Sequence, residues 1–382
     1  MKVAILGFGV VGSGCYDVIK NASSDLEVKK VLDISIKEGY EGVMTTDIND
    51  ILSDPEIEIV AETIGGLNPA FEFVSSCLKA GKNVVSSNKK LISEHFDELN
   101  SLADQNGVKL YFTSSSGGGI PWLSSLARAK RCDEIYEIRG IINGTTNYIL
   151  DKMISEGTEF DAVLKEAQSL GYAEQDPTED IDGLDVRRKC AISASVAFNT
   201  RISEHDIPVF GIREVKKDDI DYIESMGFSI RLMAYAKKLS DSVVAYVEPT
   251  IIRKTEPEAA VKENFNLISL WGRFAGRMSF YGQGAGKNPT GYGVVQDMED
   301  IAEGVNLNLY SKTKSETDNS KEIHKYYIRS SIPFGIPCEK SENVNGLYIY
   351  LTHPMSVESA HEIYNLLKER EASVFIAGFD IK

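Results

Sequence analysis

Cysteine is scarce in this sequence of 382 residues, and so are long apolar runs. The five cysteines are odd in number and form no C-x-x-C pair: Cys15, Cys77, Cys132, Cys190 and Cys338. This pattern argues against a disulfide framework or a zinc site and is typical of reduced thiols in a cytosol. No stretch reaches the roughly 18 consecutive apolar residues of a membrane helix, and the apolar start of the chain carries no cleavage signal. We therefore expect a cytoplasmic protein that does not enter a membrane.

Positive charge is also in deficit. The chain has 41 Lys and Arg against 57 Asp and Glu, which gives a net charge of -16 at pH 7. An acidic surface of this kind argues against nucleic acid or an anionic membrane as a partner. The length is sufficient for two or three domains with cores of their own.

A glycine-rich turn opens the chain. The apolar run 2–6 ends at Gly7-Phe8-Gly9-Val10-Val11-Gly12, and a helical pattern follows. Such a strand, turn and helix N-terminus predict a dinucleotide site, with the pyrophosphate on the helix N-terminus. The next predicted strand, 27–32, ends at Asp33. A carboxylate there favours NAD over NADP by bonding the ribose 2'-hydroxyl, although Lys37 weakens this inference and Asp33 could instead cap a turn.

Strands and helices continue to alternate over 57–113. Asn68 and Pro69 predict a helix start, and a strand at 83–87 delivers Lys89 at its carboxyl end, with a helix at 93–105 and a strand at 108–113 after it. Ligands bind at that edge of an open parallel sheet, so Lys89 is expected beside the cofactor, unless it is a solvated lysine in a turn.

Two further loops are rich in backbone and hydroxyl groups. Ser114 to Pro121 contains three successive glycines, whose carbonyls and amides are open to a ligand or a cation, although a flexible linker would have the same composition. After a strand at 134–142, Asn143-Gly144-Thr145-Thr146 leads into a helix at 145–156, where the threonines could bind a carboxylate.

The segment 171–189 concentrates acidic residues: Glu174, Asp176, Glu179, Asp180 and Asp182 precede a helix that carries Asp185 and Lys189. Positions i and i+4 share a helical face, so Asp185 and Lys189 can point into one cavity. Carboxylates would hold the ammonium group of an amino-acid substrate, and the lysine would give or take a proton. The alternative is a solvated loop followed by a surface ion pair.

The rest of the chain predicts an α+β domain and a small tail. Alternation over 228–252 and 265–282 indicates antiparallel strands, whose sheet is expected to make an oligomer contact. A helix at 290–303 is expected to return to the first domain and close the cofactor cleft. Residues 311–321 read as a linker. The tail is expected to contain strands at 324–329, 346–352 and 373–378 and a helix at 356–368.

Taken together and in order, these motifs resemble those of homoserine dehydrogenases over about residues 1–305. The resemblance implies an α/β protein with a Rossmann dinucleotide-binding domain at 1–131, completed by 284–305. An α+β domain at 132–283 would serve substrate binding, catalysis and dimerisation. Residues 306–322 would be a linker, and 323–382 a degenerate, ACT-like α/β appendage.

The resemblance also implies an activity and its residues. Enzymes of this family interconvert aspartate 4-semialdehyde and homoserine with NAD or NADP, in the biosynthesis of threonine, methionine and isoleucine. Lys189 looks like the proton donor, with Lys89 and Asp185 as further catalytic groups. The implied substrate-binding residues are Glu174, Asp185, Asp180, Thr145 and Tyr172. The implied cofactor-binding residues are Gly7, Gly9, Val10, Val11, Gly12, Asp33, Thr63, Lys89, Gly171 and Gly286.

Elementary chemistry agrees with this assignment, because hydride addition to a carbonyl builds negative charge that a lysine can stabilise and protonate. The sequence departs from the family pattern at two places. Thr113 replaces a glutamate before the glycine loop, where carbonyls of Ser116, Gly118 and Ile120 could bind sodium or potassium. The pattern Pro-Thr-Ala-Ser-Ala is here 289–293, Pro-Thr-Gly-Tyr-Gly, with two glycines that weaken a helix.

The expected partner is a small amino-acid substrate, and the expected assembly is a homodimer or a higher homo-oligomer. Two alternatives remain at the level of sequence. One is a non-catalytic paralogue that binds a nucleotide or an amino acid. The other is a dehydrogenase that acts on a related amino-aldehyde.

Overall fold

The computed structural model describes residues 1–22 and 24–380, and the chain divides into two compact units. Unit 1 consists of Met1–Glu134, Ser195–Arg201 and Gly282–Lys314, and unit 2 consists of Ile135–Ala194, Ile202–Tyr281 and Ser315–Lys382. In the described part of the chain, no helix combines the length and the apolar character needed to cross a membrane.

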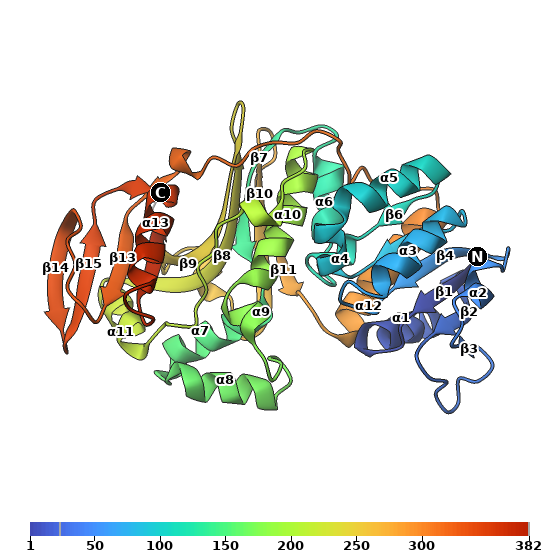
Figure 1. Ribbon diagram of the computed structural model, residues 1–382, viewed down its shortest axis with the longest axis horizontal. Helices are drawn as coiled ribbons and strands as arrows, with labels where there is room; N and C mark the ends of the chain where they lie inside the picture. The colour runs from blue at the N-terminus through green and yellow to red at the C-terminus, as the bar shows by residue number, and fades with distance from the viewer. Residues whose placement is uncertain (23, 381–382) are drawn as a thin grey trace. The chain divides into compact units, whose positions relative to one another are not determined.

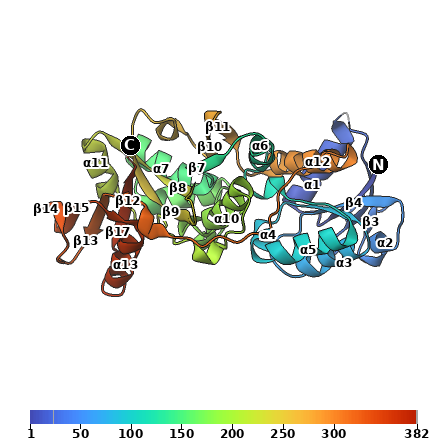
Figure 2. The same cartoon turned by 90° about the horizontal axis from the view of Figure 1, so that it is seen from above.

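Unit 1 is built on a parallel sheet with the strand order β3-β2-β1-β4-β5-β6. Helices cover both faces of this sheet, with α1 and α12 on one side and α3 and α5 on the other (Figure 2). The central strands β1 and β4 are mostly apolar and buried, as expected where both faces of a sheet are covered. The strands are β1 (Lys2–Leu6), β2 (Glu27–Leu32), β3 (Met44–Thr45), β4 (Ile57–Glu62), β5 (Asn83–Ser86) and β6 (Leu110–Tyr111). The helices are α1 (Val10–Asn21), α2 (Asn49–Leu52), α3 (Ala70–Lys79), α4 (Lys89–Glu94), α5 (Phe96–Asn106), α6 (Trp122–Ala129) and α12 (Lys287–Ala302).

Two local expectations for unit 1 were wrong. The single helix expected at 93–105 is a pair, α4 and α5, separated at His95. The first of them begins early because the Asn88 side chain accepts a hydrogen bond from Leu91 N at 3.1 Å and caps the helix. At the start of α3, Asn68 was expected to be the N-cap residue, but Pro69 takes that position.

The glycines of the 289–293 segment lie where α12 crosses other backbone. A Cβ atom at Gly291 would lie 2.6 Å from Cys15 N in α1. A Cβ atom at Gly293 would lie 2.5 Å from Gly118 O in the glycine loop. These glycines therefore permit close packing, which offsets their weak intrinsic tendency to form helix.

Unit 2 contains a mainly antiparallel sheet of nine strands within the described residues, in the order β11-β10-β7-β8-β9-β17-β13-β15-β14 (Figure 1). The strands are β7 (Ile135–Ile141), β8 (Phe228–Lys238), β9 (Val243–Arg253), β10 (Phe265–Gly272), β11 (Gly276–Gln283), β13 (Tyr326–Ser330), β14 (Cys338–Val344), β15 (Leu347–Thr352) and β17 (Phe375–Asp380). The short strands β12 (Ile323–His324) and β16 (Met355–Ser356) pair with each other. The helices are α7 (Gly144–Glu156), α8 (Phe160–Ser169), α9 (Thr178–Ile181), α10 (Leu184–Phe198), α11 (Lys217–Ser225) and α13 (Val357–Lys368).

The tail strands continue the sheet of unit 2. Strand β17 pairs in parallel with β9 on one side and antiparallel with β13 on the other. Two side-chain contacts attach β17 to the rest of the sheet. Arg139 forms an ion pair with Asp380 of β17. Glu248 packs closely against Gly378, where a Cβ atom would lie 2.1 Å from Glu248 Oε1. Strand β14, which the sequence analysis did not anticipate, forms the edge beside β15.

The segment expected to be a linker is attached along its length. Arg201 N donates to Thr313 O at 2.6 Å, and Val243 N donates to Glu316 O at 2.9 Å. The segment contains no large apolar residue over 311–321, so it contributes backbone hydrogen bonds rather than a core.

Candidate functional site

The glycine turn of unit 1 has the shape that a nucleotide-binding turn requires. Gly7 has a φ of +89°, a conformation that favours glycine. A Cβ atom at Gly12 would lie 2.0 Å from Gly7 O, so only glycine fits there. Thr63 Oγ1 lies 2.9 Å from both Leu6 O and Gly7 O and fixes the turn from β4.

The N-terminus of α1 has the features of an anion site. Gly9 is its N-cap residue and provides no side-chain hydrogen bond, so the amides of Val10, Val11 and Gly12 are not capped by that residue. Val10 is also 66% exposed. Uncapped amides at a helix N-terminus attract an anion, and the residues present therefore fit a dinucleotide pyrophosphate.

Asp33 is held in place at the end of β2. Its Oδ2 accepts from Phe8 N at 2.8 Å, and its Oδ1 accepts from Ile34 N at 2.7 Å. Lys37 Nζ lies 3.6 Å from Asp33 Oδ2 and donates to Phe8 O. The carboxylate thus caps the turn and still presents further acceptor positions, since each oxygen can take more than one hydrogen bond.

Lys89 is the first residue of α4, at the carboxyl end of β5, and is half-buried. The residues around it are fixed, because Asn88 Nδ2 donates to Gly66 O at 2.6 Å and the buried Glu62 accepts from Ser86 Oγ at 2.6 Å. Burial raises the pKa of Glu62, against the hydrogen bonds that it accepts. Gly286, with a φ of +123°, directly precedes α12 in the same unit.

The glycine loop of unit 1 contains the three residues whose carbonyls the sequence predicts as cation ligands. Ser116, Gly118 and Ile120 are all buried, and Ile120 O already accepts from Trp122 N at 2.7 Å. Thr113, where the family has a glutamate, bonds Asp297 through its amide at 2.8 Å and its hydroxyl at 2.5 Å. Within the residues that the structure describes, no three acidic, histidine or cysteine side chains form a metal cluster. The carbonyl cation site stays a prediction.

In unit 2, Lys189 is buried and held by two oxygens. Its Nζ lies 2.7 Å from Asp185 Oδ2 and donates to Ile142 O at 2.8 Å. Lys189 is only 6% exposed and Asp185 only 4%. The solvated surface pair that the sequence left open is therefore wrong, and the pair is a buried one that needs its partners.

Asp180 completes a group of acids around this lysine. Asn143 Nδ2 lies 2.7 Å from Asp180 Oδ1 and 2.8 Å from Asp185 Oδ2, so it joins the two carboxylates. Burial raises the pKa of Asp180, and the charge of Asp185 adds to this, while the hydrogen bond from Asn143 and the charge of Lys189 oppose it. A carboxyl group whose pKa is raised by burial and by a neighbouring charge marks a candidate functional site.

The other acids of the segment do not join this group. Glu179 forms an ion pair with Arg188, and Asp182 pairs with Arg213 at 2.7 Å. Asp176 accepts from Thr178 N at 3.1 Å. The expectation of one crowded acidic cavity was therefore too broad, because nearby arginines and backbone amides take these carboxylates.

The remaining predicted residues lie on the same part of unit 2. Thr145 Oγ1 donates to Tyr172 O at 2.6 Å and so connects the start of α7 to the segment after α8. Tyr172 is 38% exposed, and Glu174 is also exposed. Gly171 follows α8 with a φ of +75°.

Sequence reasoning missed Asn143, Glu62 and Asp297 as members of these sites. Asn143 had a signal, because it stands at the junction of a strand and a helix and caps α7 through Thr146 N at 2.9 Å. Glu62 ends an apolar strand and Asp297 lies on a helix beside other polar residues, and in neither case does the sequence alone identify a partner.

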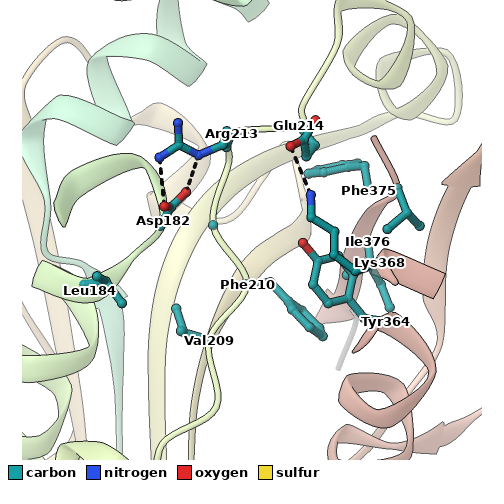
Figure 3. Close-up of a pocket in the computed structure, with 12 residues that line it drawn as sticks. Asp182, Leu184, Val209, Phe210, Arg213, Glu214, Tyr364, Lys368, Phe375 and Ile376 are labelled. Carbon is teal, nitrogen blue, oxygen red and sulfur yellow. Dashed lines mark hydrogen bonds and ion pairs between the residues drawn. The ribbon is translucent and has the colours of Figure 1, made fainter. Parts of the chain in front are cut away.

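A separate pocket of about 330 Å³ lies in unit 2 between the 209–214 segment and the tail elements α13 and β17 (Figure 3). Its floor is apolar, with Phe210 and Tyr364, and two ion pairs border it. Arg213 donates two hydrogen bonds to the Asp182 carboxylate, at 2.7 and 2.8 Å. Lys368 forms an ion pair with Glu214 at 3.0 Å. The tail thus packs against the turn that precedes α10, and no predicted substrate residue lines this pocket.

A parallel sheet with a nucleotide turn in one unit, and a buried lysine among carboxylates in the other, define a nicotinamide-dependent oxidoreductase. Comparison with known proteins makes this specific. The family model for the NAD-binding domain of homoserine dehydrogenase matches residues 7–113, and the model for homoserine dehydrogenase matches residues 121–298.

Individual relatives agree. A homoserine dehydrogenase of Bacillus subtilis is 36% identical over 81% of this chain and 74% of its own length. The structure of a homoserine dehydrogenase from Thiobacillus denitrificans superposes with a TM-score of 0.87 at 28% identity, covering 100% of this chain and 98% of that one. A hyperthermophilic archaeal homoserine dehydrogenase in complex with NADPH gives a TM-score of 0.69 at 27% identity, covering 81% and 100%.

The chain belongs to the homoserine dehydrogenase family, as the motifs predicted. It is therefore an NAD(P)-dependent oxidoreductase that interconverts L-homoserine and L-aspartate 4-semialdehyde, in the biosynthesis of aspartate-family amino acids.

Proposed function

We propose that Lys189 is the group that protonates the aldehyde oxygen of the semialdehyde, and that Asp185 holds it in place. The observation that carries this proposal is the burial of Lys189 Nζ within 2.7 Å of Asp185 Oδ2 and 2.8 Å of Ile142 O. These two acceptors fix the position and the orientation of the ammonium group at a site that water hardly reaches, as a proton donor requires.

The chemistry of the reaction requires such a group. A bound nicotinamide supplies or accepts the hydride. In the reducing direction the carbonyl oxygen gains negative charge, which Lys189 stabilises and then neutralises by giving up a proton. In the oxidising direction the deprotonated lysine accepts the hydroxyl proton of homoserine.

The remaining substrate groups are assigned by their chemistry. Asp180 and Glu174 provide carboxylates for the substrate ammonium group, and Thr145 and Tyr172 provide hydroxyl groups for its polar ends. Lys89, at the end of β5, is proposed to assist proton transfer.

The cofactor is proposed to bind at Gly7, Gly9, Val10, Val11, Gly12, Asp33 and Thr63 of unit 1, with Gly171 and Gly286 as further contacts. We propose that NAD is preferred to NADP, since the Asp33 carboxylate would repel a 2'-phosphate. The archaeal relative is in complex with NADPH, so the preference of this chain depends on its own Asp33 and Lys37 rather than on the family.

The test is turnover of homoserine by the purified protein at alkaline pH, followed by absorbance of the reduced nicotinamide with NAD and with NADP. We expect turnover with both and a higher kcat/KM with NAD. The same assay in sodium and in potassium salts tests the proposed carbonyl cation site.

Lys189→Ala is expected to lower kcat by at least about a thousandfold, because it removes the proton donor and leaves Asp185 as an uncompensated buried charge. Cofactor affinity, measured by calorimetry, should stay within about twofold of the wild type, since the nucleotide turn lies in the other unit. Loss of cofactor affinity together with turnover would mean that the lysine is structural.

We also propose that the protein is cytoplasmic and assembles as a homodimer through unit 2. The strand β11 forms one edge of the sheet and exposes apolar side chains, with Phe274 at the preceding turn 79% exposed and Tyr281 56% exposed. An apolar edge strand of this kind is usually covered by a partner. Light scattering on the eluted protein would measure its mass, and a monomer at micromolar concentration would contradict the dimer.

A further inference from the structure

We propose that Asn143 is a positioning residue for the reaction, and that its amide holds Asp180 and Asp185 side by side next to Lys189. The proposal rests on the proposed roles of Lys189 and its acids. Asn143 would not touch the reacting atoms and would act through the two carboxylates.

The orientation of the Asn143 amide is fixed on both sides. Its Nδ2 has two hydrogens, one directed at Asp180 Oδ1 at 2.7 Å and the other at Asp185 Oδ2 at 2.8 Å. Its Oδ1 accepts from Thr146 N at 2.9 Å and from Thr146 Oγ1 at 3.0 Å. A flipped amide would place its oxygen against two carboxylates and its nitrogen against a backbone donor, so only one orientation satisfies every group.

This arrangement brings together two carboxylates, of which Asp185 is buried and Asp180 is half-buried. Like charges at such a distance tend to keep a proton between them unless donors or cations compensate. Lys189 compensates Asp185 directly, at 2.7 Å. Asn143, which is only 4% exposed, donates one hydrogen to each acid and so allows Asp180 to be ionised as well.

The charged groups that act most strongly on Asp180 lie on one helix. Asp185 and Lys189 face it from α10, and Thr145 lies near it on α7 but donates its hydroxyl hydrogen to Tyr172 O. The neighbours of Asp180 in the chain point to other partners, Glu179 to Arg188 and Asp182 to Arg213. Burial has the largest effect and raises the pKa of Asp180. Among its neighbours, the charge of Asp185 raises this pKa further, and Asn143 and Lys189 lower it.

The function of an ionised Asp180 follows from the substrate. Homoserine and the semialdehyde both carry an ammonium group, which a carboxylate binds and a carboxylic acid does not bind as strongly. Asn143 thus determines the pH above which the acids are ready for the substrate, and it keeps Asp185 from turning away from Lys189.

The capping role and the positioning role of Asn143 can be separated by substitution. Serine also caps helices well, so Asn143→Ser retains an acceptor for Thr146 N but loses the amide donors. Asn143→Asp retains the acceptor and adds a third carboxylate. Asn147→Ala is the matched control on α7, because Asn147 Nδ2 donates to Glu263 O at 2.8 Å and is not bonded to these acids.

The experiment measures kcat and KM for homoserine from pH 6 to pH 10, cofactor KM, and melting temperature. For Asn143→Ser we expect the homoserine KM to rise about tenfold, since a charge-assisted hydrogen bond is lost, and the acid limb of kcat/KM to move up by about one pH unit. Cofactor KM should be unchanged. Asn143→Asp should show the same changes to a larger extent, and Asn147→Ala should lower only the melting temperature.

A pH profile and homoserine KM of Asn143→Ser equal to those of the wild type would overturn the inference. The inference would also be overturned if the changes in kcat and KM of every variant were proportional to its loss of melting temperature. Failure of the proposed function itself would appear separately, as a wild-type protein without turnover or as an active Lys189→Ala variant. In that case the inference is tested by measuring the pKa of Asp180 in the unliganded protein, by NMR titration of the side-chain carboxyl carbons. The Asp180→Asn variant assigns the Asp180 signal. An Asp180 pKa that is the same in wild type and Asn143→Ser would contradict the proposal.

Discussion

Asp297 is a buried carboxyl group whose charge state should affect the stability of unit 1. Asp297 is only 1% exposed, and its carboxyl group accepts hydrogen bonds from the backbone amide and the hydroxyl group of Thr113. Burial raises the pKa of Asp297 to about 7, from an ordinary value of 3.8, against the hydrogen bonds from Thr113. The folded protein therefore holds this proton over a pH range in which the unfolded chain has already lost it.

The direction of the pH dependence follows from this difference. Below about pH 4 both states are protonated, and as the pH rises to about 7 ionisation favours the unfolded state, so the folded state loses stability. An amide at this position does not ionise, so Asp297→Asn should be more stable than the wild type at pH 8 by on the order of 2 to 4 kcal/mol, and by less at pH 5. Denaturant unfolding at the two pH values measures this.

Glu27→Gln is the control, because Glu27 is an exposed acid and its substitution removes one negative charge without changing a buried group. A difference between Asp297→Asn and wild type that is equal at pH 5 and pH 8 would show that Asp297 does not retain a proton in the folded state.

At this scale the sequence predicted the Asp185 and Lys189 pair and Asp180, but not the amide of Asn143 that joins the two acids. Asp185 and Lys189 follow from their spacing on a helix, because local geometry decides which residues share a face. Asn143 reaches the same acids from 37 and 42 positions away, a relation that only the tertiary structure provides. The partners of Glu179 and Asp182 could not be foreseen for the same reason, because Arg188 and Arg213 lie 9 and 31 positions away in the chain.

At the scale of elements, the contact of α12 with α1 and the glycine loop depends on two glycines. The family pattern has alanine at positions 291 and 293, yet the backbone here approaches too closely for a methyl group. Gly291→Ala is expected to destabilise the protein by about 1 to 3 kcal/mol, because the clash with Cys15 N exceeds the roughly 1 kcal/mol gained in helix propensity. Thermal or denaturant unfolding measures the change.

Gly335→Ala is a suitable control, since a Cβ atom there meets nothing within 4 Å and Gly335 does not have a positive φ. A Gly291→Ala variant as stable as this control would mean that α12 can shift to make room for the methyl group. The substitution should then leave cofactor affinity unchanged as well.

Most elements could be located from sequence, because hydrophobic period and glycine boundaries are local signals. The strand at 27–32 and the helix at 145–156 agree with β2 and α7 within a residue or so. The errors occurred where a local signal was ambiguous. His95 divides α4 from α5 without a glycine or proline, and β14 alternates weakly because it is an exposed edge strand.

At the scale of the whole molecule, the tail strands hold the sheet of unit 2 together. Strand β17 fills the position between β9 and β13, and Glu248 of β9 lies against it with its pKa raised by burial to about 8. A truncated chain that ends at Glu322 should therefore lose the folded state of unit 2, because β9 becomes an open edge with buried polar groups exposed to solvent. Homoserine turnover should fall to background, while cofactor binding by unit 1 remains, as measured by calorimetry.

Glu339→Ala, on the exposed edge strand β14, is the control and should leave turnover and melting temperature close to the wild type. Turnover by the truncated chain at the wild-type rate would instead show that the tail is a separable appendage, as its sequence suggested. The sequence could not distinguish these cases, because strand order across a sheet depends on pairings between residues far apart in the chain.

The position of β17 also bears on how the protein is made. Every strand of the first sheet is translated within the first 111 residues, so that sheet can assemble early. In the second sheet the central strand β17, at 375–380, is made after both of its neighbours, β9 and β13. Until β17 is made, β9 is paired with β8 on one side only, and its open edge invites aggregation that chaperones would need to prevent.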